Sequence, residues 1–203
     1  TFSHFERRGE DGAAMTPAAF PPVTIPVAGG EILIEGKIDR LDVLPGNYIK
    51  IIDYKSGADS FDQKETRSGW RLQLMLYLKA ALNGLAGQAG PDGEAPKPAG
   101  VFYFRLAEPR IDLSFAGEEE EAELVENALQ RKFLLDGVVV NDAAVIESIA
   151  GAFTGSSDVL RLRRNQDGAF SAQSKCLISE EEFAELQQAV DQLVGRLCQD
   201  LAD

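Results

Sequence analysis

Two apolar runs near residue 40 form a predicted hairpin. Residues 31–57 read EILIEGKIDRLDVLPGNYIKIIDYKSG. The apolar pattern predicts one strand over residues 31–44 and a second over residues 48–56. The Pro-Gly-Asn sequence at residues 45–47 is a turn signal between them.

Each of these predicted strands is interrupted by charge. Asp39 lies in the first, and Asp53 and Lys55 lie in the second. Charged residues are rarely buried unless they are paired or bound to a metal. Side chains alternate along a strand, so Asp53 and Lys55 share one face. A three-residue loop pairs residue 44 with residue 48 and therefore Asp39 with Asp53, whereas a two-residue loop would send Asp39 to the opposite face.

The rest of the chain alternates predicted helices and strands. A helix with apolar residues at helical spacing ends at Asn83-Gly84, and a final helix follows a capping box formed by Ser179 and Glu182. The predicted elements are a helix at residues 70–82, a strand at 100–106, an acidic helix at 118–133, a short helix at 141–151, a hairpin of 157–164 with 169–178, and a helix at 180–202.

Two hairpins, one further strand and three or four helices predict an α/β fold with a mixed sheet. The 203 residues suit a single domain. We expect a linker-like, proline-rich segment at residues 1–30, a catalytic core at 31–115, and a helical and hairpin part at 116–203. The N-terminus is polar and lacks an initiator Met, so we expect the chain to be excised from a longer one.

Charge and cysteine content narrow the possible functions. The net charge of −13 counts against a free-standing nucleic-acid binder, although metal ions can supply positive charge where phosphate binds. Cys176 and Cys198 have no disulfide or metal-ligand spacing, which fits a reducing cytoplasm. No apolar run approaches the roughly 20 residues of a membrane span, so we expect no membrane association.

Two carboxylates on neighbouring strands suit a hard divalent cation. At about 4 Å they repel by on the order of 4 kcal/mol at an effective dielectric of 20. Mg²⁺ removes that repulsion and commonly binds one or two carboxylates plus waters and phosphate oxygens. Lys55 would then hold the attacking water or a phosphate oxygen. The alternative is a buried Asp–Lys ion pair that only shapes the sheet.

Three segments in order resemble the PD-(D/E)xK nuclease superfamily, in its RecB-like branch. They are GKIDRLD at residues 36–42, IIDYKSG at 51–57 and GWRLQLMLY at 69–77. The third adds Gln73 and Tyr77, which are four residues apart and so share one helical face. Without the resemblance they would be the polar edge of a helix.

The resemblance implies a restriction-endonuclease-like core and a metal-dependent nuclease. It implies metal binding by Asp39, Asp53 and the backbone carbonyl of Tyr54, with Mg²⁺ as the metal and Mn²⁺ as a substitute. It also implies that Lys55 orients or activates the water, while Gln73 and Tyr77 position the site or the strand.

Most of residues 30–200 is similar to the B-subunit family of AddAB-type ATP-dependent helicase/deoxyribonucleases. This similarity extends past the catalytic motif to residues 98–112, 131–146 and 154–188. It implies a DNA exonuclease domain that admits a single strand from a double-strand end. It also implies a partner helicase-nuclease subunit and a role in recombinational repair in the cytoplasm.

Two departures from the family pattern affect the expected site. That family often carries an iron–sulfur cluster, but Cys176 and Cys198 match none of its cysteine positions, so we predict no cluster in this chain. The RecB-like family has an upstream metal-binding histidine on a helix. His4 is the sole histidine here and lies in a segment that resembles a linker. We therefore expect the site in this chain to be incomplete.

Two alternative functions remain open. One is a non-catalytic, nuclease-fold scaffold that holds subunits or DNA; the acidic balance favours it and the intact Asp39, Asp53 and Lys55 oppose it. The other is a different RecB-like exonuclease, such as a CRISPR-adaptation or phage enzyme. Metal titration separates the scaffold from the nuclease, because a scaffold needs no Mg²⁺.

Overall fold

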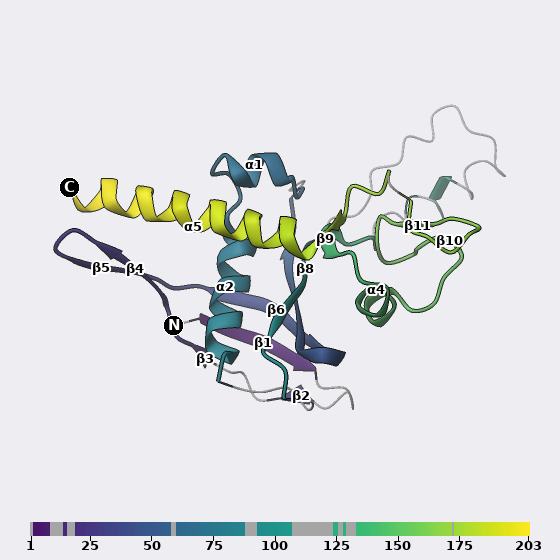
Figure 1. The fold of residues 1–203 in the computed structure, drawn as a ribbon, viewed down its shortest axis with the longest axis horizontal. Helices are drawn as coiled ribbons and strands as arrows, with labels where there is room; N and C mark the ends of the chain where they lie inside the picture. The colour runs from purple at the N-terminus through teal and green to yellow at the C-terminus, as the bar shows by residue number, and fades with distance from the viewer. Residues whose placement is uncertain are drawn as a thin grey trace.

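A mixed β-sheet with helices against it organises the protein. The computed structural model describes residues 2–8, 14–15, 19–57, 60–87, 93–106, 124–125, 128, 133–171 and 173–203, with side chains from Phe20 onward. Within these residues the sheet has eight strands in the order β12-β9-β8-β7-β6-β1-β2, and β3 also pairs with β1 (Figure 1). The strands are β1 (Phe2–Arg8), β2 (Ala14–Met15), β3 (Ala19–Phe20), β6 (Lys37–Leu44), β7 (Tyr48–Lys55), β8 (Lys97–Arg105), β9 (Asp136–Val140) and β12 (Leu177–Ile178). The predicted α/β class with a mixed sheet is confirmed.

The hairpin of β6 and β7 forms as its turn residues predict. A 3-10 turn at Pro45–Asn47 joins the strands, with Gly46 and Asn47 in the left-handed region at φ 74° and 56°. The strands pair antiparallel from Leu44↔Tyr48 to Arg40↔Ile52. The predicted three-residue loop and its register are therefore confirmed. β7 then pairs in parallel with β8, which makes the sheet mixed.

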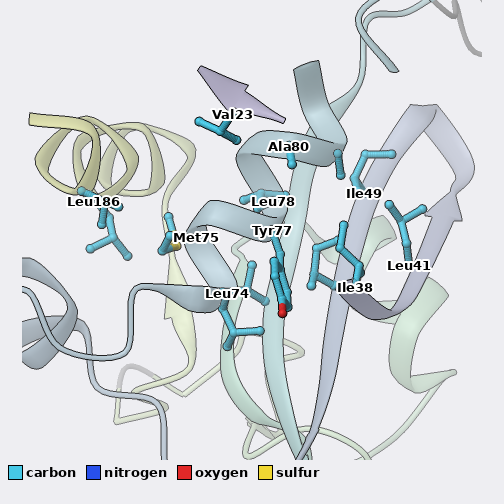
Figure 2. Close-up of a cluster of buried hydrophobic side chains, with 14 of the residues drawn as sticks. Val23, Ile38, Leu41, Ile49, Leu74, Met75, Tyr77, Leu78, Ala80 and Leu186 are labelled. Atoms are coloured by element: carbon cyan, nitrogen blue, oxygen red, sulfur yellow. The ribbon is translucent and has the colours of Figure 1, made fainter. Parts of the chain in front are cut away.

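One face of the sheet packs against two helices, α2 (Gln73–Leu85) and α5 (Glu180–Ala202). Figure 2 shows Leu74, Met75 and Leu78 of α2 between Leu186 of α5 and the hairpin residue Ile49. All five are buried, which anchors α2 beside the end of β7. Gly84 fits this packing because a Cβ there would lie 2.3 Å from the Phe20 ring.

The other face carries a second apolar core. Ile52 of β7 and Phe102 of β8 pack there with β9 and the short helix α4 (Ala143–Ala150), where Ile146 is fully buried. Since both faces are covered, β7 and β8 are nearly continuous apolar runs. This is why a charged residue within β7 stands out.

The prediction that residues 1–30 are loop-like is wrong. β1 lies in this segment and pairs in parallel with β6. A hairpin of β4 (Val23–Val27) with β5 (Gly30–Ile34) also begins there. The four prolines suggested a loop, but Pro26 is tolerated because this sheet has two strands and every strand is an edge. The single strand expected at residues 31–44 is also two strands. β5 pairs with β4 in the small sheet, whereas β6 pairs with β7 and β1 in the large one.

The C-terminal part differs from prediction in its pairing. Arg164 does bridge Phe170 across the expected turn. However, β11 (Arg163–Arg164) pairs with β10 (Gly155–Ser156), and β12 joins β9 in parallel. Long-range pairing with β9 replaces the expected local hairpin. The predicted helix at 118–133 lies almost wholly outside the described residues.

The helices are close to expectation. α2, α4 and α5 are confirmed, and α5 begins with the predicted Ser179–Glu182 capping box. The polar connection after β7 contains an unpredicted helix, α1 (Gln63–Arg67), which Asp62 caps through the amides of Lys64 and Glu65. No helix in the described part of the chain is long and apolar enough to span a bilayer.

Candidate active site

Asp53 and Lys55 form a contact at the end of β7. The carboxylate Oδ2 of Asp53 lies 2.7 Å from the ammonium Nζ of Lys55. The Asp53 side chain is 4% exposed and the Lys55 side chain 23% exposed, so the lysine lies between a buried acid and solvent. Period-2 alternation places both on the face that holds Ile49 and Ile51. A buried carboxylate therefore has its counter-charge on the same strand.

Asp39 reaches the same place from β6. The last pair of the β6–β7 ladder is Arg40↔Ile52, and the next residues outward are Asp39 and Asp53. Oδ2 of Asp39 accepts a hydrogen bond of 2.9 Å from the backbone N–H of Tyr54. Because that N–H belongs to the peptide that follows Asp53, the Asp39 carboxylate lies beside Asp53, as the loop length predicts.

Gln73 and Tyr77 extend this group from the first turns of α2. Gln73 Oε1 accepts a hydrogen bond of 2.7 Å from Lys55 Nζ, and its Nε2 donates one of 2.7 Å to the hydroxyl of Tyr77. Tyr77 is 8% exposed and packs in the α2 core, so its hydroxyl is a fixed acceptor. The chain of contacts runs from Asp53 through Lys55 and Gln73 to Tyr77, which unites the four residues.

The segment before α2 holds Gln73 in position. Arg71 has a positive φ of 56°, which is uncommon for a residue with a side chain. Its guanidinium donates to the carbonyl of Ser60 and lies 3.7 Å from Glu65. These contacts hold the start of α2, which carries Gln73, against the connection that follows β7, which carries Lys55. They therefore keep Lys55 and Gln73 close together.

A row of residues crosses three strands next to the site. Asp53 pairs with Tyr103 of β8, and Tyr103 pairs with Asp136 of β9. Lys55 Nζ lies 5.2 Å from the centre of the Tyr103 ring, a cation–π distance. Asp136 is 7% exposed and contacts Arg105 at 3.0 Å and Arg161 at 3.6 Å.

A second charged group lies on the opposite face of the same hairpin. Asp42 contacts Arg40 at 2.9 Å and Lys50 at 2.7 Å. Burial alone would raise the pKa of Asp42, but the hydrogen bond from Arg40 and the nearby Lys50 ammonium outweigh it and hold that pKa below its usual range. The same hydrogen bond raises the pKa of Arg40. This group is a satisfied ion network across β6 and β7.

The donors at the Asp53 site are oxygens. The two carboxylates of Asp39 and Asp53 suit Mg²⁺, which keeps several waters and does not need a complete protein cage. The described residues bring together no group of three or more His, Cys, Asp or Glu side chains, so a metal with a full protein ligand set is not supported by them. Lys55 is the counter-charge that a cation beside Asp53 would share or displace. The residues present therefore fit Mg²⁺.

The remaining candidate ligands are His4, Cys176 and Cys198. His4 is on β1, where its backbone pairs with Ile38, and not on a helix; its side chain lies outside the described residues. Both cysteines are buried and free. Burial raises the pKa of the Cys176 thiol to about 11, and its Sγ donates to the carbonyl of Arg161.

Comparison with known proteins gives the family. The chain matches the PD-(D/E)XK nuclease superfamily over residues 2–203. It belongs to that superfamily. The mixed sheet with flanking helices is the core architecture expected for a PD-(D/E)XK nuclease.

Relatives within the superfamily are named as the B subunit of an ATP-dependent helicase/deoxyribonuclease. The protein from Clostridium botulinum strain Hall is 30% identical over 188 residues, and that from Clostridium tetani is 34% identical over 188 residues; each match covers 91% of this chain. The protein from Thermoanaerobacter sp. strain X514 is 32% identical over 205 residues, or 98% of the chain. The chain spans about 16–17% of the length of these relatives. Both resemblances expected from the sequence are thereby confirmed.

Residues of this nuclease domain that sequence reasoning missed are Tyr103, Asp136, Arg105 and Arg161. One signal was present: LLDGVVV at residues 134–140 embeds an acid in an apolar run, just as IIDYK does. Gly137 adds to it, because a Cβ there would lie 1.9 Å from the carbonyl oxygen of Val101. A buried strand beside β8 explains both features.

Proposed function

We propose that this domain is a Mg²⁺-dependent deoxyribonuclease that hydrolyses phosphodiester bonds of DNA. The observation that carries the proposal is the chain of contacts from Asp53 through Lys55 and Gln73 to Tyr77, with Asp39 beside it. These five residues come from two strands and a helix, and they converge at the exposed end of β7 in a member of a nuclease superfamily.

Each residue has a distinct role in the proposal. Asp39, Asp53 and the carbonyl of Tyr54 bind Mg²⁺, with Mn²⁺ as a substitute. When bound, the cation would lower the pKa of a water and offset charge on the scissile phosphate. Lys55 holds the attacking water or a phosphate oxygen by donating a hydrogen bond from Nζ. Gln73 fixes the direction of that ammonium, and Tyr77 fixes Gln73.

For the longer protein we propose the role that its relatives' names indicate. It would be a subunit of an ATP-dependent helicase/exonuclease in the cytoplasm, working with a partner helicase-nuclease subunit. Its substrate would be double-strand DNA ends processed for recombinational repair, with one strand entering this site. The support is the identity of 30–34% to helicase/deoxyribonuclease B subunits over most of the chain.

The rival is a scaffold that keeps the fold without cutting DNA. One observation favours it: Asp53 and Lys55 already neutralise each other at 2.7 Å, so the strand needs no cation to bury its acid. A scaffold would lose stability or assembly when this pair is broken, and it would not need Mg²⁺.

The test is strand-specific cleavage of an end-labelled duplex by the full-length assembly. Asp53→Ala and Lys55→Ala should each lower cutting of this subunit's strand by roughly 1,000-fold, since Asp53 holds the cation and Lys55 contacts the water or phosphate. Asp39→Asn should be partly rescued by Mn²⁺, because the amide oxygen remains a weaker ligand. ATP-driven unwinding should survive in all three, because the chain contains no phosphate-binding loop motif.

Melting temperature and subunit assembly are the controls. A well-folded Asp53→Ala assembly that cuts its strand at the normal rate would defeat the nuclease proposal. Loss of stability or assembly in Asp53→Ala and Lys55→Ala, with cutting otherwise indifferent to both substitutions, would support the scaffold instead.

A further inference from the structure

A groove of about 730 Å³ lies beside the row of residues that crosses the sheet. α1 and the residues before it form one wall, the start of β9 forms the floor, and the segment before β12 forms the other wall. Its charged lining residues are Asp62, Lys64, Arg67, Asp136, Arg161 and Lys175. We refer to it as the α1–β9 groove.

The α1–β9 groove is cationic in a strongly acidic chain. Four cations and two acids line it, whereas the chain as a whole has a net charge of −13. Both acids are already engaged. Asp62 accepts from the amides of Lys64 and Glu65 as the cap of α1, and Asp136 contacts Arg161 and Arg105.

The cations are more available than the acids. Among the residues that the structure describes, no acidic side chain lies within 4 Å of the ammonium groups of Lys64 and Lys175. Arg67 has a loose contact of 3.9 Å with Glu185, which is 61% exposed. Such an exposed pair contributes little and leaves the guanidinium able to bind another anion.

One residue of the groove lining is paired, through one intervening strand, with the candidate active site. Asp136 belongs to its lining and also to the row in which Asp53, Tyr103 and Asp136 are paired across β7, β8 and β9. Two strand spacings separate Asp53 from Asp136, or about 10 Å. A polyanion that lies in the groove is therefore about two strand spacings from Asp53.

We infer that the α1–β9 groove binds the phosphodiester backbone of a single nucleic-acid strand next to the bond that is cut. This rests on the proposed nuclease function and adds the path of the substrate. Sites for single strands combine a cationic groove with an aromatic side chain on which a base stacks. Phe61 lines the groove together with the four cations, and Gln63 and Gln173 add hydrogen-bonding groups.

Photocrosslinking tests the location directly. Gln173→Cys carries a photoactivatable thiol reagent in the full-length protein, with Asp53→Ala to prevent cutting. We expect it to crosslink to an oligonucleotide with a free single-stranded end. The matched control is Arg196→Cys, on an exposed turn of α5 outside the groove lining. Equal crosslinking from both positions, or none from Gln173→Cys, would overturn the inference.

A charge reversal measures the contribution of the cations. Lys64→Glu with Lys175→Glu should lower kcat/KM for cutting a single strand at least tenfold. The dependence of log(kcat/KM) on log[NaCl] should become less steep by about 1.4, because two phosphate contacts are lost. Arg196→Glu also reverses a positive charge, but outside the groove lining, and it should change neither kcat/KM nor its salt dependence. Lys64→Gln with Lys175→Gln should give an intermediate loss and guards against misfolding of the reversed variant.

The outcomes separate the two proposals. If Asp53→Ala abolishes cutting but the double reversal leaves the rate and salt dependence unchanged, the nuclease proposal stands and the groove inference fails. If the double reversal instead weakens only the binding of the partner subunit, the groove holds an acidic protein segment and the inference also fails. If Asp53→Ala still cuts while the groove crosslinks to DNA, the nuclease proposal fails and strand binding in the groove stands.

Discussion

Lys55 contacts two partners at once through its ammonium group. Its Nζ lies 2.7 Å from both Asp53 Oδ2 and Gln73 Oε1, and the Tyr103 ring lies to one side at 5.2 Å. Removing one partner of a buried ion pair costs several kcal/mol, so the buried Asp53 carboxylate requires a positive group beside it, either an ammonium or a metal ion. Lys55 supplies it, and a metal ion beside Asp53 would free the ammonium to turn toward a water or phosphate while Gln73 keeps hold of it.

The hydrogen bond from Lys55 to Gln73 orients the ammonium group. Gln73→Ala should lower kcat for strand cutting about 10- to 100-fold, the usual cost of losing a partner that orients a functional group. KM should change little, because Gln73 acts through Lys55. Tyr77→Phe keeps the ring in the core and loses only the hydroxyl that accepts from Gln73, so its effect should be under about tenfold.

Steady-state kinetics on a labelled single strand, with melting temperature measured in parallel, checks this order. A loss in Gln73→Ala that appears wholly in KM, or an effect of Tyr77→Phe larger than that of Gln73→Ala, would contradict a positioning role.

The site residues predicted from sequence are those whose relative positions depend on nearby parts of the chain. Asp39, Asp53 and Lys55 follow from a three-residue turn and the period of a strand. Gln73 and Tyr77 are indicated by the resemblance to the superfamily, and helical spacing places them on one face. Asp136 was missed because its approach depends on β9 pairing with β8, more than thirty residues away in the chain. Local patterns carry no information about which strand a distant segment joins.

The strands β6 and β7 carry different chemistry on their two faces. One face brings Asp39 and Asp53 to the site, and the other holds Asp42 between Arg40 and Lys50. Asp42 and Lys50 are directly opposite in the ladder, so their ion pair fixes the register. A slip of one residue would break that pair and also move Asp39 away from Asp53. The ion network on one face of the hairpin therefore fixes the register that places Asp39 beside Asp53 on the other face.

Asp42 makes the stability of this hairpin sensitive to acid. Its pKa is lower in the folded protein than in the unfolded chain, so its ionised form stabilises the fold at neutral pH. That contribution is lost as the pH falls below about 4 and through the folded pKa. Asp42→Asn should cost about 3 kcal/mol at pH 7, because it leaves Arg40 and Lys50 without their anion.

Urea denaturation of the chain from pH 7 to pH 2 checks this. The variant should show a shallower loss of stability in acid than the wild type. Asp200→Asn, at an exposed position on α5, serves as the matched control and should follow the wild-type curve. An Asp42→Asn variant with the full wild-type acid dependence would show that other carboxylates are responsible.

Charge is distributed unevenly over the protein. The chain carries 33 acidic and 20 basic side chains, yet four of the basic ones line the α1–β9 groove beside the candidate site. The excess negative charge elsewhere repels nucleic acid and leaves the groove as a favourable approach. It also means that any divalent cation will stabilise the fold to some degree by relieving self-repulsion. A specific metal site must therefore be separated from this general effect.

The dependence of folding stability on Mg²⁺ distinguishes a specific metal site from general relief of charge repulsion. Mg²⁺ at ten times its dissociation constant should stabilise the fold by about 1.4 kcal/mol, because it binds the folded site and not the unfolded chain. For a domain of this size that is a rise in melting temperature of about 3–6 °C. Asp53→Ala should abolish the specific part of the rise, since it removes a ligand. Lys55→Ala should keep it, since the carboxylates remain and their counter-charge is gone.

NaCl at matched ionic strength measures the general screening effect, and calorimetric melting of each variant with and without Mg²⁺ is the measurement. Equal rises in the wild type and Asp53→Ala would mean that the cation acts only on the acidic surface, and the pair of Asp53 and Lys55 would then be a structural ion pair.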